Sequence, residues 1–144
     1  MKTSALLWCI LAFTSPAIAQ DIDFGDNASE YANDGECDDR RFIGRNMTSS
    51  LDWDDAGHDA DDCRRGYDLG LIQLWDETKA RAATQCSAIR FGNNASEYAN
   101  DGECDDIRFE GTGSSSILLP DDSGRDAADC KRACDQGTIF LRNY

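Results

Sequence analysis

Two groups of acidic residues recur in this chain, and each contains or adjoins a cysteine. The first is a turn-like run at residues 33–39, Asn-Asp-Gly-Glu-Cys-Asp-Asp, and the second ends in Asp-Cys at residues 59–63. Carboxylate and amide oxygens are hard ligands, which Ca²⁺ takes in sets of about six to eight. Both groups occur twice. The expected calcium ligands are Asn33, Asp34, Asp38, Asp39, Asp59 and Asp62, and their counterparts Asn100, Asp101, Asp105, Asp106, Asp126 and Asp129.

The two occurrences belong to a longer internal duplication. Residues 24–74 align with residues 91–141 at a constant offset of 67, and 32 of the 51 positions are identical. The shared positions are mostly Asp, Asn, Gly and Cys rather than large apolar residues. Both copies therefore preserve the residues of a site and not merely those of a hydrophobic core.

The first 19 residues have the pattern of a secretory signal. Lys2 supplies the positive charge, residues 5–13 are apolar, and Ala17-Ile18-Ala19 is a small-x-small cleavage sequence. The apolar stretch is too short to span a bilayer, so no membrane insertion is expected. We predict a periplasmic or secreted protein, cleaved near Ala19.

The cysteines predict disulfide bonds. Cys9 lies in the signal, which leaves six of the seven cysteines, and an even number in an exported chain is typical of disulfides. Six cysteines allow about fifteen pairings, but the symmetry of the duplication and then exclusion favour one of them. A redox pair of Cys130 and Cys134 is the rival interpretation, although no Cys-x-x-Cys motif accompanies it. The expected bonds are Cys37–Cys63, Cys104–Cys130 and Cys86–Cys134.

Charge and size narrow the class of protein. The formal net charge of −14 argues against nucleic acid and anionic membrane surfaces as partners, and it is compatible with cations or a basic partner. A repeat of about 50 residues has a marginal hydrophobic core. We therefore expect a small α+β fold, stabilised by disulfides and metal, in which two tandem repeats combine short helices, short strands and much loop.

The expected organisation follows from helix and turn signals. We expect a signal at 1–19, a first repeat at 22–74, a helical linker of about three turns at 75–88, and a second repeat at 89–144. Within the repeats, Asp-Gly and Gly stops mark the ends of helical segments. The expected elements are helical turns at 28–33 and 95–100, helices at 59–68 and 126–136, strands at 71–74 and 138–141, and loops between the two conserved blocks.

The acidic residues also have a simpler interpretation. Asp59 and Asp62 would suit the first turn of a helix, and Asp38 and Asp39 could pair with Arg40 or Arg41. The spacing does not fit an EF-hand. Zinc is disfavoured because the thiols should be oxidised and His58 is the only histidine.

Two resemblances bear on these alternatives. The sequence Asn-Asp-Gly-Glu-Cys-Asp, followed by Asp-x-Gly-x-Asp-Ala-x-Asp-Cys, resembles the calcium-binding Notch (Lin-12) repeat and, less closely, the class A repeat of the LDL receptor. Both families fold around one calcium ion and several disulfides, which implies calcium at the matching Asp residues. They have six cysteines per module, whereas two are shared by both copies here. The runs Ala-Asn-Asp-Gly-Glu-Cys-Asp-Asp and Arg-Asp-Ala-x-Asp-Cys also resemble a recurrent module of exported bacterial proteins.

The sequence thus predicts an exported, calcium-binding interaction protein, with one Ca²⁺ per repeat and a protein or glycan as its partner. It is not expected to be an enzyme, because no Gly-x-Ser-x-Gly or Ser/His/Asp set is present. A metal-independent interaction protein or inhibitor is the alternative. A small hydrolase is the third possibility.

Overall fold

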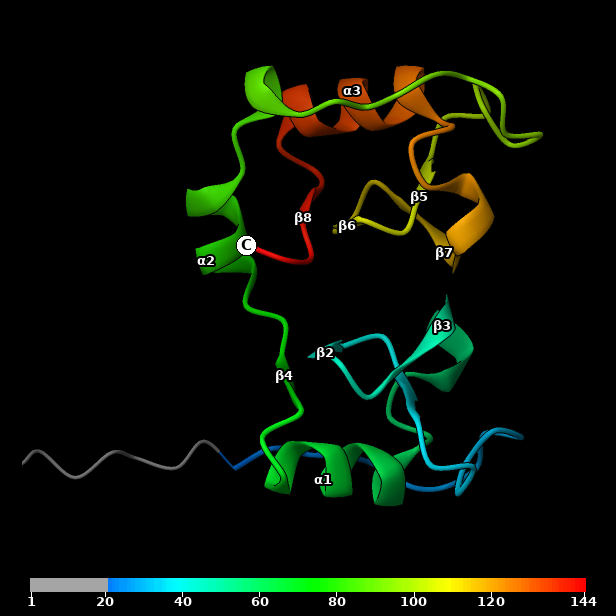
Figure 1. Cartoon of the computed structure of the whole chain (residues 1–144), viewed down its shortest axis with the longest axis vertical. Coiled ribbons are helices and arrows are strands. Elements are labelled where there is room, and N and C mark those ends of the chain that lie inside the picture. Colours follow the sequence, from blue (N-terminus) through cyan, green and yellow to red (C-terminus); the bar gives the residue numbers. More distant parts are fainter. Residues whose placement is uncertain (1–20) are drawn as a thin grey trace, which may run out of the picture.

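The computed structural model describes residues 21–144, so the signal expected at 1–19 lies outside the described residues. The described chain is a small α+β structure (Figure 1). The helices are α1 (Ala60–Asp68), α2 (Glu77–Ala83) and α3 (Ala127–Gln136), with short 3₁₀ turns η1 (Trp53–Asp55), η2 (Cys86–Ala88) and η3 (Pro120–Asp122). The strands are β1 (Cys37–Asp39), β2 (Phe42–Gly44), β3 (Met47–Asp52), β4 (Ile72–Leu74), β5 (Cys104–Asp106), β6 (Phe109–Glu110), β7 (Ser114–Leu119) and β8 (Phe140–Leu141).

A four-stranded sheet in the order β1-β3-β7-β5 joins the two copies of the repeated sequence. Its outer pairs are parallel, and its central pair, β3 with β7, is antiparallel. Leu51 pairs with Leu118, which is its own counterpart 67 residues later. The central contact therefore relates the two copies by a local pseudo-twofold axis, with α1 and α3 at opposite ends of the molecule (Figure 1).

The loops expected between the conserved blocks were a wrong prediction. Residues 47–52 and 114–119 are instead the strands at the centre of the sheet, and each has one buried leucine, Leu51 and Leu118. These segments contain several serines and differ between the two copies, so their local sequence gives little indication of a strand. Strand pairing depends on partners elsewhere in the chain. The helical turns expected at 28–33 and 95–100 are non-helical turns, closed by bonds such as the Asp34 N–H donating to the Tyr31 carbonyl.

The helices expected after the second acidic group are present as α1 and α3. The Gly137 residue ends α3 in the left-handed conformation that glycine tolerates best. The short strands expected after them are β4 and β8, which pair with β2 and β6 respectively. Within residues 21–144, no helix is both long and apolar enough to cross a membrane.

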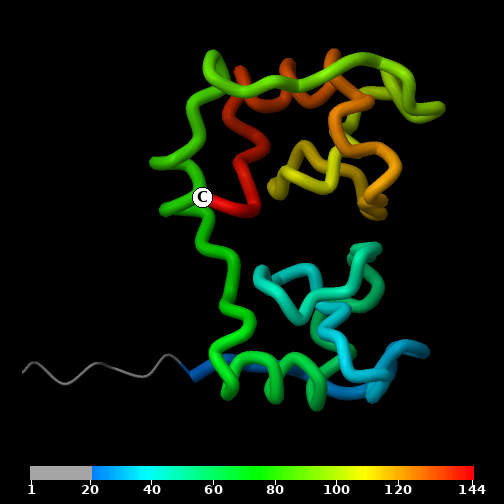
Figure 2. The backbone as a smooth tube through the Cα atoms, viewed as in Figure 1, coloured from blue at the N-terminus to red at the C-terminus, as the bar shows by residue number. Residues whose placement is uncertain are grey.

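The linker is shorter in helix than expected and is attached to the second copy. Its helix α2 ends at Ala83, and a separate 3₁₀ turn, η2, follows. The Thr84 hydroxyl accepts a hydrogen bond from the Leu141 N–H at 2.9 Å, and the Trp75 indole N–H donates to the Leu141 carbonyl at 3.2 Å. The backbone trace shows the chain after β4 running along the side of the second copy, with the C-terminal segment beside it (Figure 2).

Each copy has its own small core. Phe24 stacks on Phe42 at 5.5 Å between ring centroids in the first copy, and Phe91 stacks on Phe109 at 5.6 Å in the second. A buried disulfide completes each core. Apolar burial on this scale is small, so the cross-links and polar contacts carry much of the fold.

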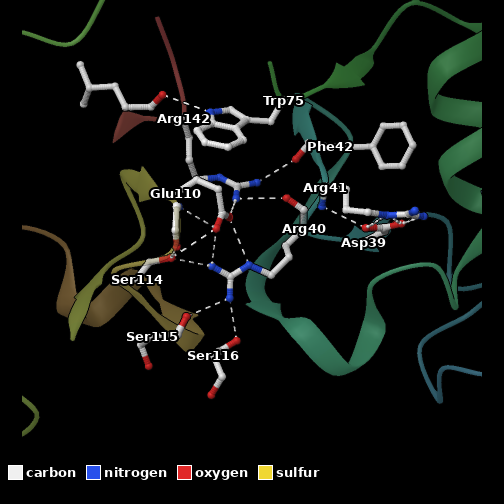
Figure 3. Close-up of polar contacts among 12 residues, drawn as sticks. Asp39, Arg40, Arg41, Phe42, Trp75, Glu110, Ser114, Ser115, Ser116 and Arg142 are labelled. Carbon is white, nitrogen blue, oxygen red and sulfur yellow. Dashed lines mark hydrogen bonds and ion pairs between the residues drawn. The ribbon is translucent and has the colours of Figure 1, made fainter. Parts of the chain in front are cut away.

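A buried ionic cluster of Arg40, Glu110 and Arg142 lies between the copies (Figure 3). The Arg40 Nε and Nη2 donate to the two oxygens of Glu110 at 3.1 and 2.9 Å, and Nη1 donates to the carbonyls of Ser115 and Ser116. Arg142 also binds Glu110. All three side chains are at most 7 % exposed. The cluster therefore joins the β1–β2 turn of the first copy to the second copy through charge-assisted bonds.

The cluster supplies a stability prediction. Glu110→Gln leaves two buried guanidinium groups without their carboxylate, and breaking a buried ion pair costs about 3–5 kcal/mol. We expect a loss of that order in the free energy of unfolding, measured by urea denaturation of the oxidised protein. Glu103→Gln, an exposed change in the same copy, is the control and should alter it by less than about 0.5 kcal/mol. Equal stability of the two variants would contradict this role.

Candidate metal centre

The three disulfides join Cys37 to Cys63, Cys104 to Cys130 and Cys86 to Cys134, the pairs derived from the duplication. The first holds β1 against α1 with the two Cα atoms 4.6 Å apart, and its counterpart does the same for β5 and α3 at 4.5 Å. Asp38 follows Cys37 directly, and Asp59 begins the turn of α1 that carries Cys63. The bond therefore forces these carboxylates into proximity.

Asp59 holds the N-cap position of α1, but its side chain does not cap the helix. Its Oδ2 accepts a hydrogen bond from the backbone N–H of Asp38 at 2.8 Å, while its Oδ1 is buried and has no hydrogen-bond partner. The Oδ2 of Asp38 is likewise buried and without a partner. Buried carboxylate oxygens without partners are costly and call for a proton or a cation.

The second copy has the same arrangement. The Asp105 N–H donates to Asp126 Oδ2 at 3.0 Å, and Asp105 Oδ2 and Asp126 Oδ1 are buried without a hydrogen-bond partner, as is Asp129 Oδ1. Asp126 is fully buried, as is Asp59. The unsatisfied pair therefore recurs at equivalent positions, where the aspartates and the neighbouring cysteines are identical in both copies.

Burial shifts the protonation of these carboxyls. Loss of hydration raises the pKa of Asp38 to about 7 and that of Asp59 to about 6, and neighbouring carboxylates add to both shifts. Burial raises the pKa of Asp105 to about 6 and also raises the pKa of Asp126. The hydroxyls of Thr48 and Ser115 oppose the rise at Asp38 and Asp105 through hydrogen bonds. A divalent cation would reverse these shifts by stabilising the ionised carboxylates.

Asp34 completes the acidic group from the turn before β1. It is exposed, and one of its oxygens accepts a hydrogen bond from the Glu36 N–H. Its charge raises the pKa of both Asp38 and Asp59, which places it beside the two buried carboxyls. Asp101 acts in the same way on Asp105 and Asp126. Three of the expected ligands per copy thus lie together.

The remaining expected ligands have other contacts. Asp39 accepts hydrogen bonds from Arg41 and from the Gly57 N–H, and Asp106 repeats this with Arg108 and Gly124. This is the arginine pairing that the sequence left open for Asp39. Asp39 and Asp106 therefore position the loop before the helix, and a metal would have to displace an arginine to reach them.

Asp62 and Asp129 hold the acidic turn in place. Asp62 Oδ2 accepts a hydrogen bond from the Gly35 N–H at 2.9 Å, and its Oδ1 pairs with Arg65. Asp129 accepts from the Gly102 N–H at 3.1 Å, and its other oxygen lies 2.7 Å from Arg132. Asn33 and Asn100 are exposed turn residues with left-handed backbone, at φ +72° and +75°.

Asp55 and Asp122 belong to the site but were absent from the expected ligands. Asp55 adds to the raised pKa of Asp38, and its Oδ1 accepts a hydrogen bond from the Ser29 hydroxyl at 2.6 Å. Asp122 does the same with Ser96, also at 2.6 Å. Their identity in both copies was the available signal. Asp34, Asp38 and Asp55 face a cavity of about 290 Å³ beside β3.

In each copy, two cysteines and one aspartate form a group whose available metal donor is the carboxylate. The Cys37 and Cys63 sulfurs and one carboxylate oxygen of Asp59 lie within 4.8 Å of one another, as do the corresponding atoms of Cys104, Asp126 and Cys130. The two groups could hold a metal ion. Because the sulfurs are joined in disulfides, they offer no thiolate ligand, and the oxygens remain as donors.

The raised pKa values predict an unusual pH dependence for the metal-free protein. The native state retains protons on Asp38 and Asp59 that the unfolded chain, with carboxyl pKa values of about 4, has already lost. Stability in a chelator should therefore fall as the pH rises from about 4 to about 7, because the native state binds more protons in this window. Urea denaturation across the pH range measures this dependence. Asp38→Asn with Asp105→Asn should flatten it, and an equally steep fall in that variant would contradict the assignment.

Comparisons of the chain with protein-family models, with curated proteins and with solved structures found no match.

Proposed function

We propose that this chain is an exported two-repeat protein in which each repeat binds one Ca²⁺, and that the metal stiffens a surface used to bind a protein or a glycan. The observation that carries the proposal is the pair of buried carboxylates in each copy whose inward oxygens have no partner. A cation between them removes the desolvation cost and the mutual repulsion together. The proposal assigns no reaction to the protein.

The proposed ligands of the first ion are Asp34, Asp38 and Asp59, with Asp55 beside them. Those of the second are Asp101, Asp105 and Asp126, with Asp122 beside them. In each copy these residues come from the turn, the first strand, the 3₁₀ turn and the start of the helix. A cation held there ties four segments together, which explains why a chain with so small a core would retain an acidic cluster.

The donor chemistry favours calcium over other metals. Carboxylates and water are hard ligands, and Ca²⁺ accepts the irregular sets of oxygens that a turn and a helix end provide. Mg²⁺ requires a near-octahedral arrangement and keeps most of its waters. Zinc prefers thiolate and imidazole, but the described cysteines are in disulfides, and His58 hydrogen-bonds Asp26.

The disulfides support an oxidising location. Three cross-links in a short chain are typical of proteins that fold outside the cytosol. Extracellular and periplasmic fluids can also hold calcium at concentrations that load weak sites of the kind found in extracellular modules. Export, disulfide formation and calcium loading are therefore mutually consistent.

Thermal unfolding of the oxidised protein tests calcium binding. Calcium should raise the midpoint relative to a chelator, because binding to the native state alone adds about 2.7 kcal/mol at a hundredfold excess over the dissociation constant. Asp59→Asn with Asp126→Asn should abolish the calcium-dependent shift. Asp54→Asn with Asp121→Asn is the matched control, because these exposed aspartates also recur in both copies. An unchanged wild-type midpoint across millimolar calcium would instead favour the metal-independent interaction protein.

The two sites should be separable by stoichiometry. Asp38→Asn removes one unpartnered carboxylate from the first site and leaves the second site intact. Isothermal titration should then report one calcium ion per chain in place of two, and Asp105→Asn should give the same count through the other site. A loss of both ions on either single substitution would show that the copies do not bind independently.

A further inference from the structure

A second candidate site lies where the two copies differ. A cavity of about 500 Å³ opens beside the ionic cluster between the copies, and Trp53, Trp75 and Leu74 form its apolar walls. Its volume falls in the range of ordinary small-ligand pockets. The positions equivalent to Trp53 and Trp75 in the second copy are Pro120 and Arg142. The two tryptophan walls of this cavity are therefore not repeated in the second copy.

Both tryptophan rings are held in place before any ligand arrives. The Trp75 indole N–H donates to the Leu141 carbonyl, and the guanidinium of Arg40 lies 4.6 Å from the ring centre of Trp53 (Figure 3 shows Trp75 above the cluster). Trp53 is nevertheless 45 % exposed. An immobilised and partly exposed aromatic ring loses little entropy on binding, which suits it to ligand stacking.

The charged floor of the cavity does not call for a charged ligand. Arg40 is fully buried, and its Nε, Nη1 and Nη2 all donate to Glu110, to serine carbonyls or to the Ser114 hydroxyl. Glu110 pairs with both Arg40 and Arg142, and the remaining positive charge of the cluster is directed at backbone carbonyls rather than at the cavity. The chain as a whole is strongly acidic, so an anion would also be repelled at long range. The ligand that fits is electrically neutral.

The rim of the cavity adds polar groups to the aromatic walls. Thr112 contributes an exposed hydroxyl, and Arg41 and Glu77 contribute partly exposed donors and acceptors. The Glu77–Arg81 pair is at the surface and is therefore weak. A wholly apolar ligand would cover such groups without pairing them, which costs free energy. The ligand should therefore have apolar faces and hydroxyl-bearing edges.

A pyranose ring has this chemistry, because its C–H groups form an apolar face and its hydroxyls both donate and accept. We propose that the cavity between the copies binds a neutral saccharide, which stacks on Trp53 and Trp75 and hydrogen-bonds to the rim at Thr112 and Glu77. This inference deepens the binding role proposed above by naming the class of partner. It rests on that role but does not require calcium at the acidic sites.

Tryptophan fluorescence and titration calorimetry test the proposal, because both tryptophans of the described chain line the cavity. The probes are glucose, galactose, mannose and N-acetylglucosamine, with trisaccharides built from them, and indole as an apolar-ring control. At least one saccharide should bind with a dissociation constant on the order of 1 mM or lower. Trp53→Ala should weaken that binding about tenfold or more, which corresponds to about 1.4 kcal/mol.

Two further variants separate stacking from loss of structure. Trp53→Phe should keep part of the affinity, and Leu69→Ala, which removes an exposed leucine outside the cavity, should keep all of it. Binding of indole without any saccharide would overturn the proposal, as would saccharide binding that survives Trp53→Ala. The calcium-dependent shift in unfolding should persist in Trp53→Ala. If it is absent from the wild type while a saccharide binds, calcium binding fails and the saccharide site stands.

Discussion

The structure depends on the crowding of carboxylates around a disulfide. In each copy one bond holds the first strand against the helix, and the aspartates that follow and precede the two cysteines are carried into the interior with it. Ionised, these groups repel one another and lack water, so burial and mutual repulsion raise the pKa of both Asp38 and Asp59. The surrounding contacts satisfy some of the carboxylate oxygens and not others. Backbone N–H groups and arginines satisfy some carboxylate oxygens, whereas the inward oxygens of Asp38 and Asp59 have no hydrogen-bond partner.

A second constraint concerns the contact between the copies. Leu51 and Leu118 pair as counterparts, as they would in a symmetric dimer. The ionic cluster breaks that symmetry. In the other copy, the positions equivalent to the three cluster residues Arg40, Glu110 and Arg142 hold Ile107, Ile43 and Trp75. The ion pairs therefore have no symmetric counterparts. Shared residues thus build the acidic sites and the central strand pair, and differing residues build the ionic cluster and the two tryptophan walls of the cavity beside it.

Local signals in the sequence were sufficient for some of these features. The duplication predicted the disulfide pairs correctly, because Cys86 and Cys134 were the two remaining cysteines without counterparts. The acidic residues at the start and the glycines after the end of each helix predicted α1 and α3. Other features were not visible locally. The segments that form β3 and β7 were expected to be loops. Their strand structure depends on pairing with other parts of the chain, which the local sequence does not reveal. Arg40 and Glu110 are 70 residues apart and have no shared pattern, so nothing in the sequence marked them as a buried pair.

The sequence by itself determined the ingredients of the acidic sites: which residues recur, which cysteines recur with them, and therefore which oxygens would be close. Only the tertiary structure decided how those oxygens are used. It assigned Asp39 and Asp62 to arginines and turn N–H groups, and it left Asp38 and Asp59 with free inward atoms. It also created the cavity walled by Trp53 and Trp75. The physical reason is that residue identity defines what a side chain can bind, whereas burial and the distance to other groups define what remains for it to bind.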